Sequence, residues 1–335
     1  MVSLKTAFYK KELSVEDLSY ISKLLDTNIS FHQTLDLLRN KKNEKIFEDI
    51  IKQLDEGKLI ETIIPSYLPK QIKDYMFPLL KTLSFSSALS LSLEFYDKHK
   101  NNESNLLSQI AYPCILLFIT ITVLYLFDLY GMDTIFNLVT TFTSDIGIYK
   151  DIRVVFRIII NFFYYGLLLG ILLLIFFIQP KRISILYMFI SKYLPNSLVT
   201  TYYSEEYVSL MLSCVKKGYK TKEILEILKS MKTKPIISFL AYHMDESLLQ
   251  GETLRQATKK NYYDLSLPRF IKIANYTNDF GNMLEAYIML AKEKISRMMK
   301  KYTLTIQICT YMFIGIIVIF IYQILFMPMQ ALSIY

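Results

Sequence analysis

Three long apolar runs constrain this chain more than any other feature of its sequence. They extend from Ile110 to Tyr130, from Ile158 to Ile178 and from Thr303 to Met327. At about 1.5 Å per helical residue, runs of this length cover the roughly 30 Å hydrocarbon core of a bilayer. The alternative is a buried helix in a large soluble core, but so few charges over such lengths favour membrane spans. The sequence therefore predicts three transmembrane helices.

Charges beside these runs predict the orientation of the chain. The loop between the first two runs is short and slightly acidic, whereas residues 179–302 are rich in Lys and Arg next to both flanking runs. The positive-inside rule then places the N-terminus and the long middle segment in the cytoplasm, and the loop and C-terminus outside. Arg153 and Arg157 lie on the outer side in this scheme and count against it.

Composition favours helices and offers little reactive chemistry. Gly and Pro number only 9 each, which disfavours turn-rich β folds. No Walker A, GxGxxG, GxSxG, HExxH or CxxC pattern occurs in the sequence. The three cysteines and three histidines are scattered, which argues against a disulfide framework or a zinc site. We therefore expect no enzyme activity, and no catalytic, cofactor-binding or metal site.

Asp128 and Arg157 are the charges closest to the membrane interior, near the outer ends of the first two runs. Two readings stay open. Each side chain snorkels separately to the outer interface, which is the favoured reading because interfacial charges are common. Alternatively, the two form a membrane ion pair across neighbouring helices.

Two segments of the chain resemble each other, one before the first apolar run and one before the third. Residues 27–38 and 217–228 both read as a short polar turn followed by an amphipathic helix. Gly57 and Gly251 each follow an amphipathic stretch and suit a helix C-cap, where a left-handed residue is needed. Each copy then has a Leu-Pro pair and a long helix that leads into an apolar run. The same order twice predicts an internal duplication.

The second copy carries the motifs of a known family. They are a glycine turn at Gly218, a Leu-rich helix over Glu223–Leu228, and the segments Gln250–Leu254 and Asp279–Leu284. On these motifs the chain resembles the type II secretion F family, the platform proteins of type II secretion systems, type IV pili and competence pseudopili. The resemblance extends from about residue 18 to about residue 332.

Three further residues fit the same family. Tyr112-Pro113 at the start of the first run is similar to the family's Tyr-Pro entry motif, and Pro328 stands near the end as in its members. Within the acidic-Gly motif we expect Gly281 to have a left-handed or close-packed backbone and Asn282 to cap the next helix. The first copy departs from the family, because it lacks this motif.

The short chain and its degenerate first copy are most similar to the Gram-positive competence version of the family. The resemblance implies a scaffold beneath a pseudopilus used in DNA uptake, with a cytoplasmic assembly ATPase, pilin-like subunits and a homo-oligomer as partners. Platform proteins of secretion systems or type IV pili are the alternative, and a small membrane transporter is a more remote one. Basic clusters in the cytoplasmic segments favour solvated faces and membrane lipid over direct nucleic-acid binding.

The expected fold is all-α: a polytopic cell-membrane protein with three transmembrane helices and two homologous cytoplasmic helical bundles. The expected boundaries are a first bundle 1–109, span one 110–131, an outer loop 132–153, span two 154–179, a second bundle 180–302, span three 303–327 and an outer tail 328–335.

Overall fold

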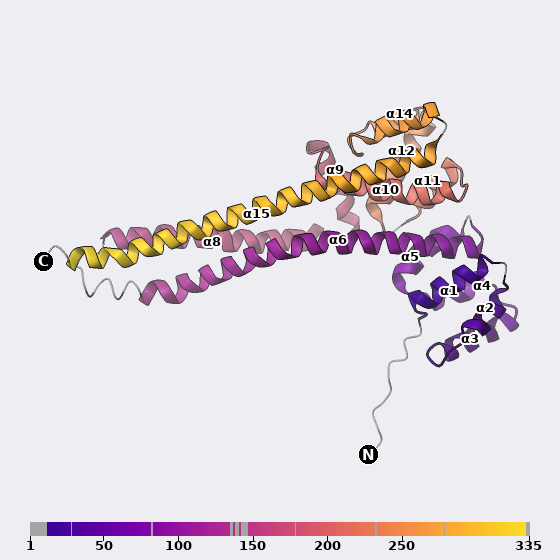
Figure 1. Cartoon of the computed structure of the whole chain (residues 1–335), viewed down its shortest axis with the longest axis horizontal. Helices are drawn as coiled ribbons and strands as arrows, with labels where there is room; N and C mark the ends of the chain where they lie inside the picture. The colour runs from indigo at the N-terminus through magenta and orange to yellow at the C-terminus, as the bar shows by residue number, and fades with distance from the viewer. Residues whose placement is uncertain are drawn as a thin grey trace, which may run out of the picture. The chain divides into compact units, whose positions relative to one another are not determined.

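The computed structural model describes residues 12–332, apart from positions 28, 82, 135–136, 138–140, 142–146, 178, 232 and 278. Over these residues it is all-helical and contains no strand, as the sequence predicts (Figure 1). The chain divides into two compact units. Unit 1 joins Met1–Glu103 to Ile183–Glu293, and unit 2 joins Ser104–Arg182 to Lys294–Tyr335.

The first part of unit 1 is a bundle of short helices followed by one long helix. In order these are α1 (Val15–Leu25), α2 (Phe31–Leu38), α3 (Glu44–Asp55), α4 (Ile60–Ile63), the 3-10 turn η1 (Ile64–Ser66), α5 (Lys70–Leu80) and α6 (Phe85–Leu126). N-terminal caps determine where α1 and α2 begin. The Ser14 side chain accepts a hydrogen bond from the backbone N–H of Asp17, and Ser30 forms a capping box with Gln33. Their apolar faces close over a core that contains Leu35.

The second part of unit 1 repeats this order after one extra helix. Its helices are α9 (Pro180–Tyr193), α10 (Leu198–Lys216), α11 (Thr221–Lys229), α12 (Pro235–Leu249), α13 (Leu254–Thr258), α14 (Leu267–Thr277) and α15 (Phe280–Leu332). From α10 onward the α-helices follow the same order in both copies, and a long helix ends each of them; the 3-10 turn η1 between α4 and α5 has no counterpart between α13 and α14.

Gly57 and Gly251 occupy the same place in the two copies. Each is the second residue after its helix, α3 or α12, and each has a positive φ, 80° and 82°. The N–H groups of each glycine and of the residue after it bond carbonyls three and five residues back, at 2.9–3.2 Å. This is the Schellman ending, which requires a left-handed residue and so favours glycine.

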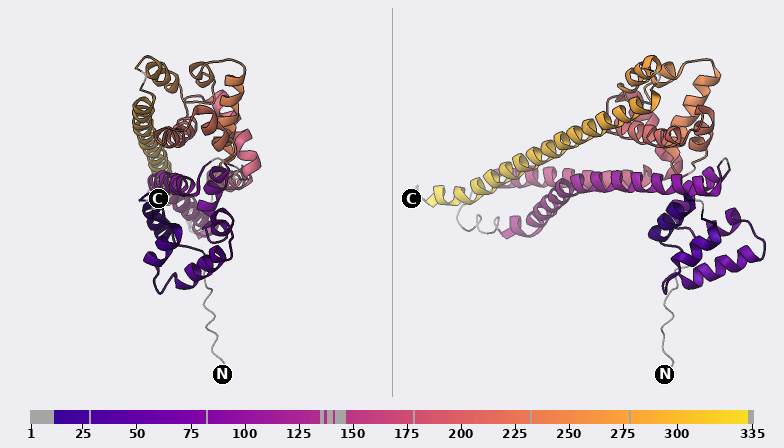
Figure 2. Two further views of the ribbon diagram at one scale, coloured as in Figure 1. Left: turned by 90° about the vertical axis from the view of Figure 1, so that its right-hand side faces the viewer. Right: turned by 45° about the vertical axis from the view of Figure 1, so that its right-hand side comes forward.

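Helix α6 holds the two copies together, because it is buried on two sides. Leu89 and Leu93 belong to the core of the first copy, whereas Ala88, Leu91 and Phe95 belong to the core of the second. Figure 2 shows the two copies on opposite sides of the first part of α6. Unit 1 is thus a pair of bundles that share one long helix.

Unit 2 contains the apolar helices. It consists of the end of α6, the π turn η2 (Phe127–Gly131), α8 (Gly147–Phe177) and the end of α15. Two helical stretches among the described residues are long and apolar enough to cross a membrane, Cys114–Thr134 and Val154–Leu173. Few of their side chains are buried within the structure, unlike those of a soluble core helix.

The third predicted span, 303–327, lies within α15 and is helical throughout. It packs against α8 through Phe313, whose ring centroid is 4.6 Å from that of Phe163. Several of its other side chains lie outside the described residues, and its role as a span stays a prediction.

Candidate functional site

The residues that the sequence singles out do not gather in one pocket. Gly57 and Gly251 end helices in separate copies, and Tyr112 is an exposed residue of α6. Pro113 and Pro328 lie in the long helices α6 and α15, but their side chains fall outside the described residues.

The expectation for Gly281 and Asn282 is wrong. Gly281 lies in the first turn of α15, its φ is not positive, and a Cβ built on it would meet nothing within 4 Å. Asp279 caps this helix instead, because its carboxylate accepts from the backbone N–H of Asn282 at 3.2 Å and from the Asn282 amide at 2.7 Å. The physical reason is that an Asp three residues ahead provides the N-cap and leaves Asn282 inside the helix.

Asp128 and Arg157 form an ion pair between the two apolar helices of unit 2. Arg157 Nε donates to Asp128 Oδ2 at 3.2 Å, and the side chains are 47% and 3% exposed respectively. Asp128 Oδ1 is buried and has no hydrogen-bond partner among the described residues. Of the two alternatives left open by the sequence, separate snorkelling or an ion pair, the structure contains the ion pair.

A π turn places Asp128 at this position. The N–H of Met132 bonds the carbonyl of Phe127, five residues back, so one extra residue is accommodated in the turn. Gly131 permits the turn, since a Cβ there would lie 2.6 Å from Cδ2 of the Phe127 ring. The ring in turn makes an edge contact with Phe156 of α8.

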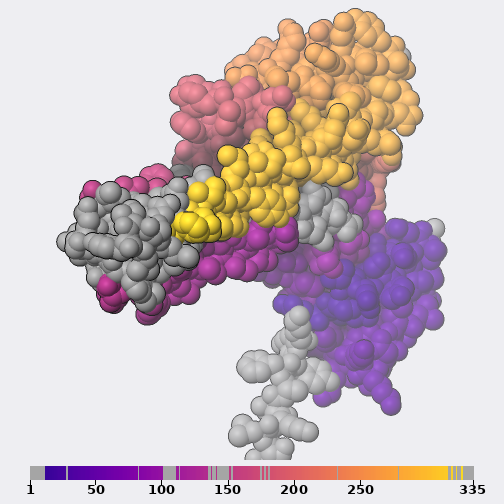
Figure 3. All heavy atoms as spheres, turned by 60° about the vertical axis from the view of Figure 1, so that its left-hand side comes forward, coloured from indigo at the N-terminus to yellow at the C-terminus, as the bar shows by residue number. Residues whose placement is uncertain are grey.

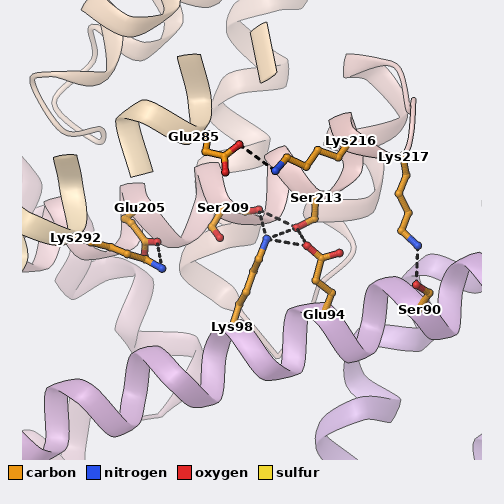
Figure 4. A network of polar contacts seen from close by, with 10 residues as sticks. All are labelled: Ser90, Glu94, Lys98, Glu205, Ser209, Ser213, Lys216, Lys217, Glu285 and Lys292. Atoms are coloured by element: carbon orange, nitrogen blue, oxygen red, sulfur yellow. Dashed lines mark hydrogen bonds and ion pairs between the residues drawn. The ribbon is translucent and has the colours of Figure 1, made fainter. Parts of the chain in front are cut away.

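A second polar cluster joins the two copies within unit 1, and we call it the α6–α10 seam (Figure 4). It contains Ser90, Glu94 and Lys98 of α6, opposite Ser209 and Ser213 of α10, with Lys217 at the end of that helix. Both sets are spaced four residues apart, so each forms one stripe along its helix.

The seam is closed by charge-assisted hydrogen bonds. Lys98 Nζ donates to Ser213 Oγ at 2.6 Å and lies 2.9 Å from Glu94, which accepts from Ser213 at 2.8 Å. Lys217 donates to Ser90 at 2.7 Å. Partial burial opposes ionisation of Glu94, but hydrogen bonds from Lys98 and Ser213 outweigh it and lower its pKa.

A triad centred on the buried carboxylate of Glu206 lies beside the seam. Lys234 Nζ donates to Glu206 Oε1 at 2.7 Å and lies 2.7 Å from Nδ1 of His99. His99 comes from α6 of the first copy, and Glu206 and Lys234 come from the second. Burial works against ionisation of Glu206, yet its bond to His99 and the charge of Lys234 lower its pKa below 4.5.

On its other side α10 is tied to α15. Lys216 Nζ lies 3.0 Å from Glu285, and Lys292 Nζ lies 3.7 Å from Glu205 (Figure 4). Helix α10 thus bridges α6 and α15, the two long helices that end the copies. These are the bonds of a charge-paired helix interface.

Cys214 lies on α10 next to Ser213 of the seam. Burial raises the pKa of the Cys214 thiol to about 12, so it stays protonated at neutral pH. Among the described residues no group of three or more His, Cys, Asp or Glu could hold a metal ion.

Sequence reasoning did not find the seam or the triad. A signal was present, because Ser90, Glu94 and Lys98 repeat at the same interval as Ser209 and Ser213. Stripes of this kind are also typical of solvated helix faces, so the interval alone does not reveal that the two face each other.

Comparison with known proteins identifies part of the chain. Residues 207–328 match the family described as Type II secretion system (T2SS), protein F. The match begins inside α10, includes the rest of the second copy, and reaches almost to the end of α15. No curated protein matches the chain. The resemblance read from the sequence is confirmed over this segment, and residues 207–328 form a type II secretion system protein F domain.

Proposed function

We propose that this protein is an inner-membrane platform for assembly of a type IV pilus-like competence pseudopilus used in DNA uptake. The observation that carries the proposal is the protein F domain at residues 207–328. Proteins with this domain are structural platform proteins of type II secretion, type IV pilus and competence systems, and they are inner-membrane proteins. The scaffold couples a cytoplasmic assembly ATPase to the insertion of pilin-like subunits.

The architecture supports a scaffold in two ways. The paired bundles of unit 1 expose charges of both signs, such as Lys216 and Glu285, which suits docking to a cytoplasmic protein partner. The apolar helices of unit 2 expose large side chains, such as Phe162 and Leu172, suited to packing against other helices in lipid. Force applied to the bundles would reach the spans along α6 and α15, which are single helices of 42 and 53 residues.

The proposal includes three spans, with the N-terminus and both bundles in the cytoplasm and the C-terminus outside. It also includes descent of the two copies from one duplicated domain, supported by their common helix order and matching glycine endings. A platform of a type II secretion system or a type IV pilus is the alternative within the family.

Gene deletion tests the function. Loss of the gene should abolish surface pseudopili and DNA uptake while pilin synthesis continues. An internal deletion of residues 200–290, which keeps the apolar runs, should have the same effect because coupling to the ATPase would be lost. A deletion strain that still assembles pseudopili and fails only in moving a solute would support the transporter instead.

A further inference from the structure

Helix α9 turns an apolar face away from the protein. Ile185, Met188, Phe189 and Tyr193 fall at positions i, i+3, i+4 and i+8 and therefore share one side of this 14-residue helix. Their exposed fractions range from 42% to 62%. These four residues, with Lys192 between them, are here called the α9 face. Figure 3 shows the surface of the second copy, coloured by residue number.

The opposite side of the helix fixes this orientation. The hydroxyl of Tyr187 donates to the carbonyl of Tyr262 at 2.5 Å, and its buried ring contacts Tyr203 and Phe239 edge-on. Ser191, one turn further along, is also fully buried. Rotating α9 to hide its apolar face would break these contacts, so the face stays outward.

The charges of α9 are all positive. The helix contains Lys181, Arg182 and Lys192 and no acidic residue. A groove of about 710 Å³ lies between the α9 face and the segment Lys260–Tyr262, and no acidic side chain is among the described residues that line it. Lys260 pairs with Glu252 at 3.4 Å, and Lys192 adds a second positive charge to the lining of the groove.

Continuity along the chain indicates what covers this face. Helix α9 begins at Pro180, three residues after the end of α8, and α8 contains the candidate span Val154–Leu173. The start of α9 is therefore close to a membrane surface if that span crosses the bilayer. A short helix with aromatic and aliphatic residues beside Lys and Arg, and no acid, suits the surface of an acidic leaflet.

We propose that α9 is an interfacial helix, with the α9 face inserted among the headgroups of anionic phospholipids. The proposal rests on the membrane location of the proposed platform and adds a second mode of membrane contact to it. The aromatic rings of Phe189 and Tyr193 supply apolar anchorage, and Lys192 attracts lipid phosphate. Contact with the bilayer would hold the start of the second copy against the membrane surface.

A fluorescent label tests the position of the α9 face. The full chain, without its native cysteines, receives an environment-sensitive dye at Phe189→Cys, and is reconstituted into two kinds of vesicle. One kind is phosphatidylcholine alone, and the other is an equimolar mixture with phosphatidylglycerol. Compared with phosphatidylcholine alone, the mixed vesicles should shift the emission of the dye to shorter wavelength and reduce its quenching by iodide several-fold. Lipids with a nitroxide near the headgroup should quench the dye.

Matched controls come from α14, another helix of the second copy. Tyr276 is 78% exposed, and a dye at Tyr276→Cys should stay accessible to iodide in both vesicles. Lys192→Glu should restore iodide quenching at position 189, whereas Lys272→Glu on α14 should leave it unchanged.

Several results would overturn the inference. One is equal iodide quenching of the dye at positions 189 and 276, and another is equal protection of position 189 with and without phosphatidylglycerol. A third is protection from iodide without quenching by the nitroxide lipid, because that result would indicate a contact with protein. A chain that floats with the vesicles but has an exposed label contradicts only the interfacial helix. A chain that does not float with them contradicts the membrane platform as well.

Discussion

The triad of His99, Glu206 and Lys234 shows how single residues hold the two copies of unit 1 together. A buried carboxylate is costly unless it is paired, and here it is paired from both sides of the junction. Removing one member leaves another charge buried, so the cost of a substitution exceeds the value of a surface ion pair.

Glu206→Gln should lower the free energy of unfolding by about 3 kcal/mol at neutral pH, because the Lys234 charge loses its partner. The folded pKa of Glu206 lies below its ordinary value of 4.5, so its contribution is present above that pH and lost as pH falls through the folded pKa. The difference from wild type should therefore be large near neutral pH and shrink as the pH falls below 4.5 toward the lowered pKa. Thermal unfolding in detergent measures it.

The control is Glu226→Gln, an exposed residue of α11, which should change the free energy of unfolding by less than about 0.5 kcal/mol. An equal loss at both pH values would show that Glu206 acts through packing and not through its charge.

Gly57 and Gly251 are the second case at this scale. Ala at Gly251 should cost about 1–2 kcal/mol, because its φ of 82° is left-handed, and there is no clash since a Cβ would meet nothing within 4 Å. Gly57→Ala should cost about the same, since the two endings are equivalent. Gly281→Ala, at an open site with ordinary φ, should be neutral or stabilising by up to about 1 kcal/mol. Unfolding midpoints of the three variants decide this, and a large loss at Gly281 would contradict the helical first turn.

Among the elements, the π turn η2 has the clearest structural purpose. It lies where α6 ends, holds Asp128 toward Arg157 of α8, and depends on a glycine for the position of the Phe127 ring. Such turns occur often at functional sites, and this one sets the contact between two apolar helices.

Gly131→Ala should destabilise the protein by about 1–3 kcal/mol, because the new Cβ overlaps the Phe127 ring. Adding Phe127→Ala should remove the clash, so the double variant should lose less than the sum of the two single variants. Gly166→Ala in α8 is the matched control, since a Cβ there would meet nothing within 4 Å. Melting curves in detergent give all four values. Strict additivity of Gly131→Ala and Phe127→Ala would refute the steric explanation.

At the scale of the whole molecule, the proposed orientation places both copies of unit 1 in the cytoplasm, and the first loop and the C-terminus outside. Cysteines at Ser144 and Ser333, which lie outside the described residues, should react with an impermeant thiol reagent in intact protoplasts. Cysteines at Lys41 and Lys222, which are exposed in the two copies, should react only after lysis. The native cysteines are removed first. Reaction at Lys222→Cys in intact cells would invert the proposed orientation.

Much of the fold could be predicted because its signals are local. Long apolar runs predict the two candidate spans, and a glycine after an amphipathic stretch predicts the endings at Gly57 and Gly251. The order of these signals predicts the common helix order of the two copies. The failure at Gly281 is also local, because Asp279 and Asn282 both suit an N-cap and the sequence does not rank them.

The candidate site could not be predicted in the same way, because its partners are distant in sequence. Lys98 and Ser213 are 115 residues apart, and His99 and Lys234 are 135 apart. A stripe of Ser, Glu and Lys on a helix suits water as well as another helix, and only packing decides between them. Likewise the charges of Asp128 and Arg157 are plain in the sequence, but their pairing depends on the π turn that directs one toward the other.

The sequence alone determined which segments are helical, which runs are apolar enough to span a membrane, where two helices end in a left-handed glycine, and which family the second copy resembles. Tertiary structure decided which face of α6 meets α10, that Glu206 is buried with its charge retained, and that the α9 face is left uncovered. The physical reason is the distance along the chain over which each interaction acts. Periodicity and capping act within a few turns of one helix, whereas burial and charge pairing are set by which helices pack together.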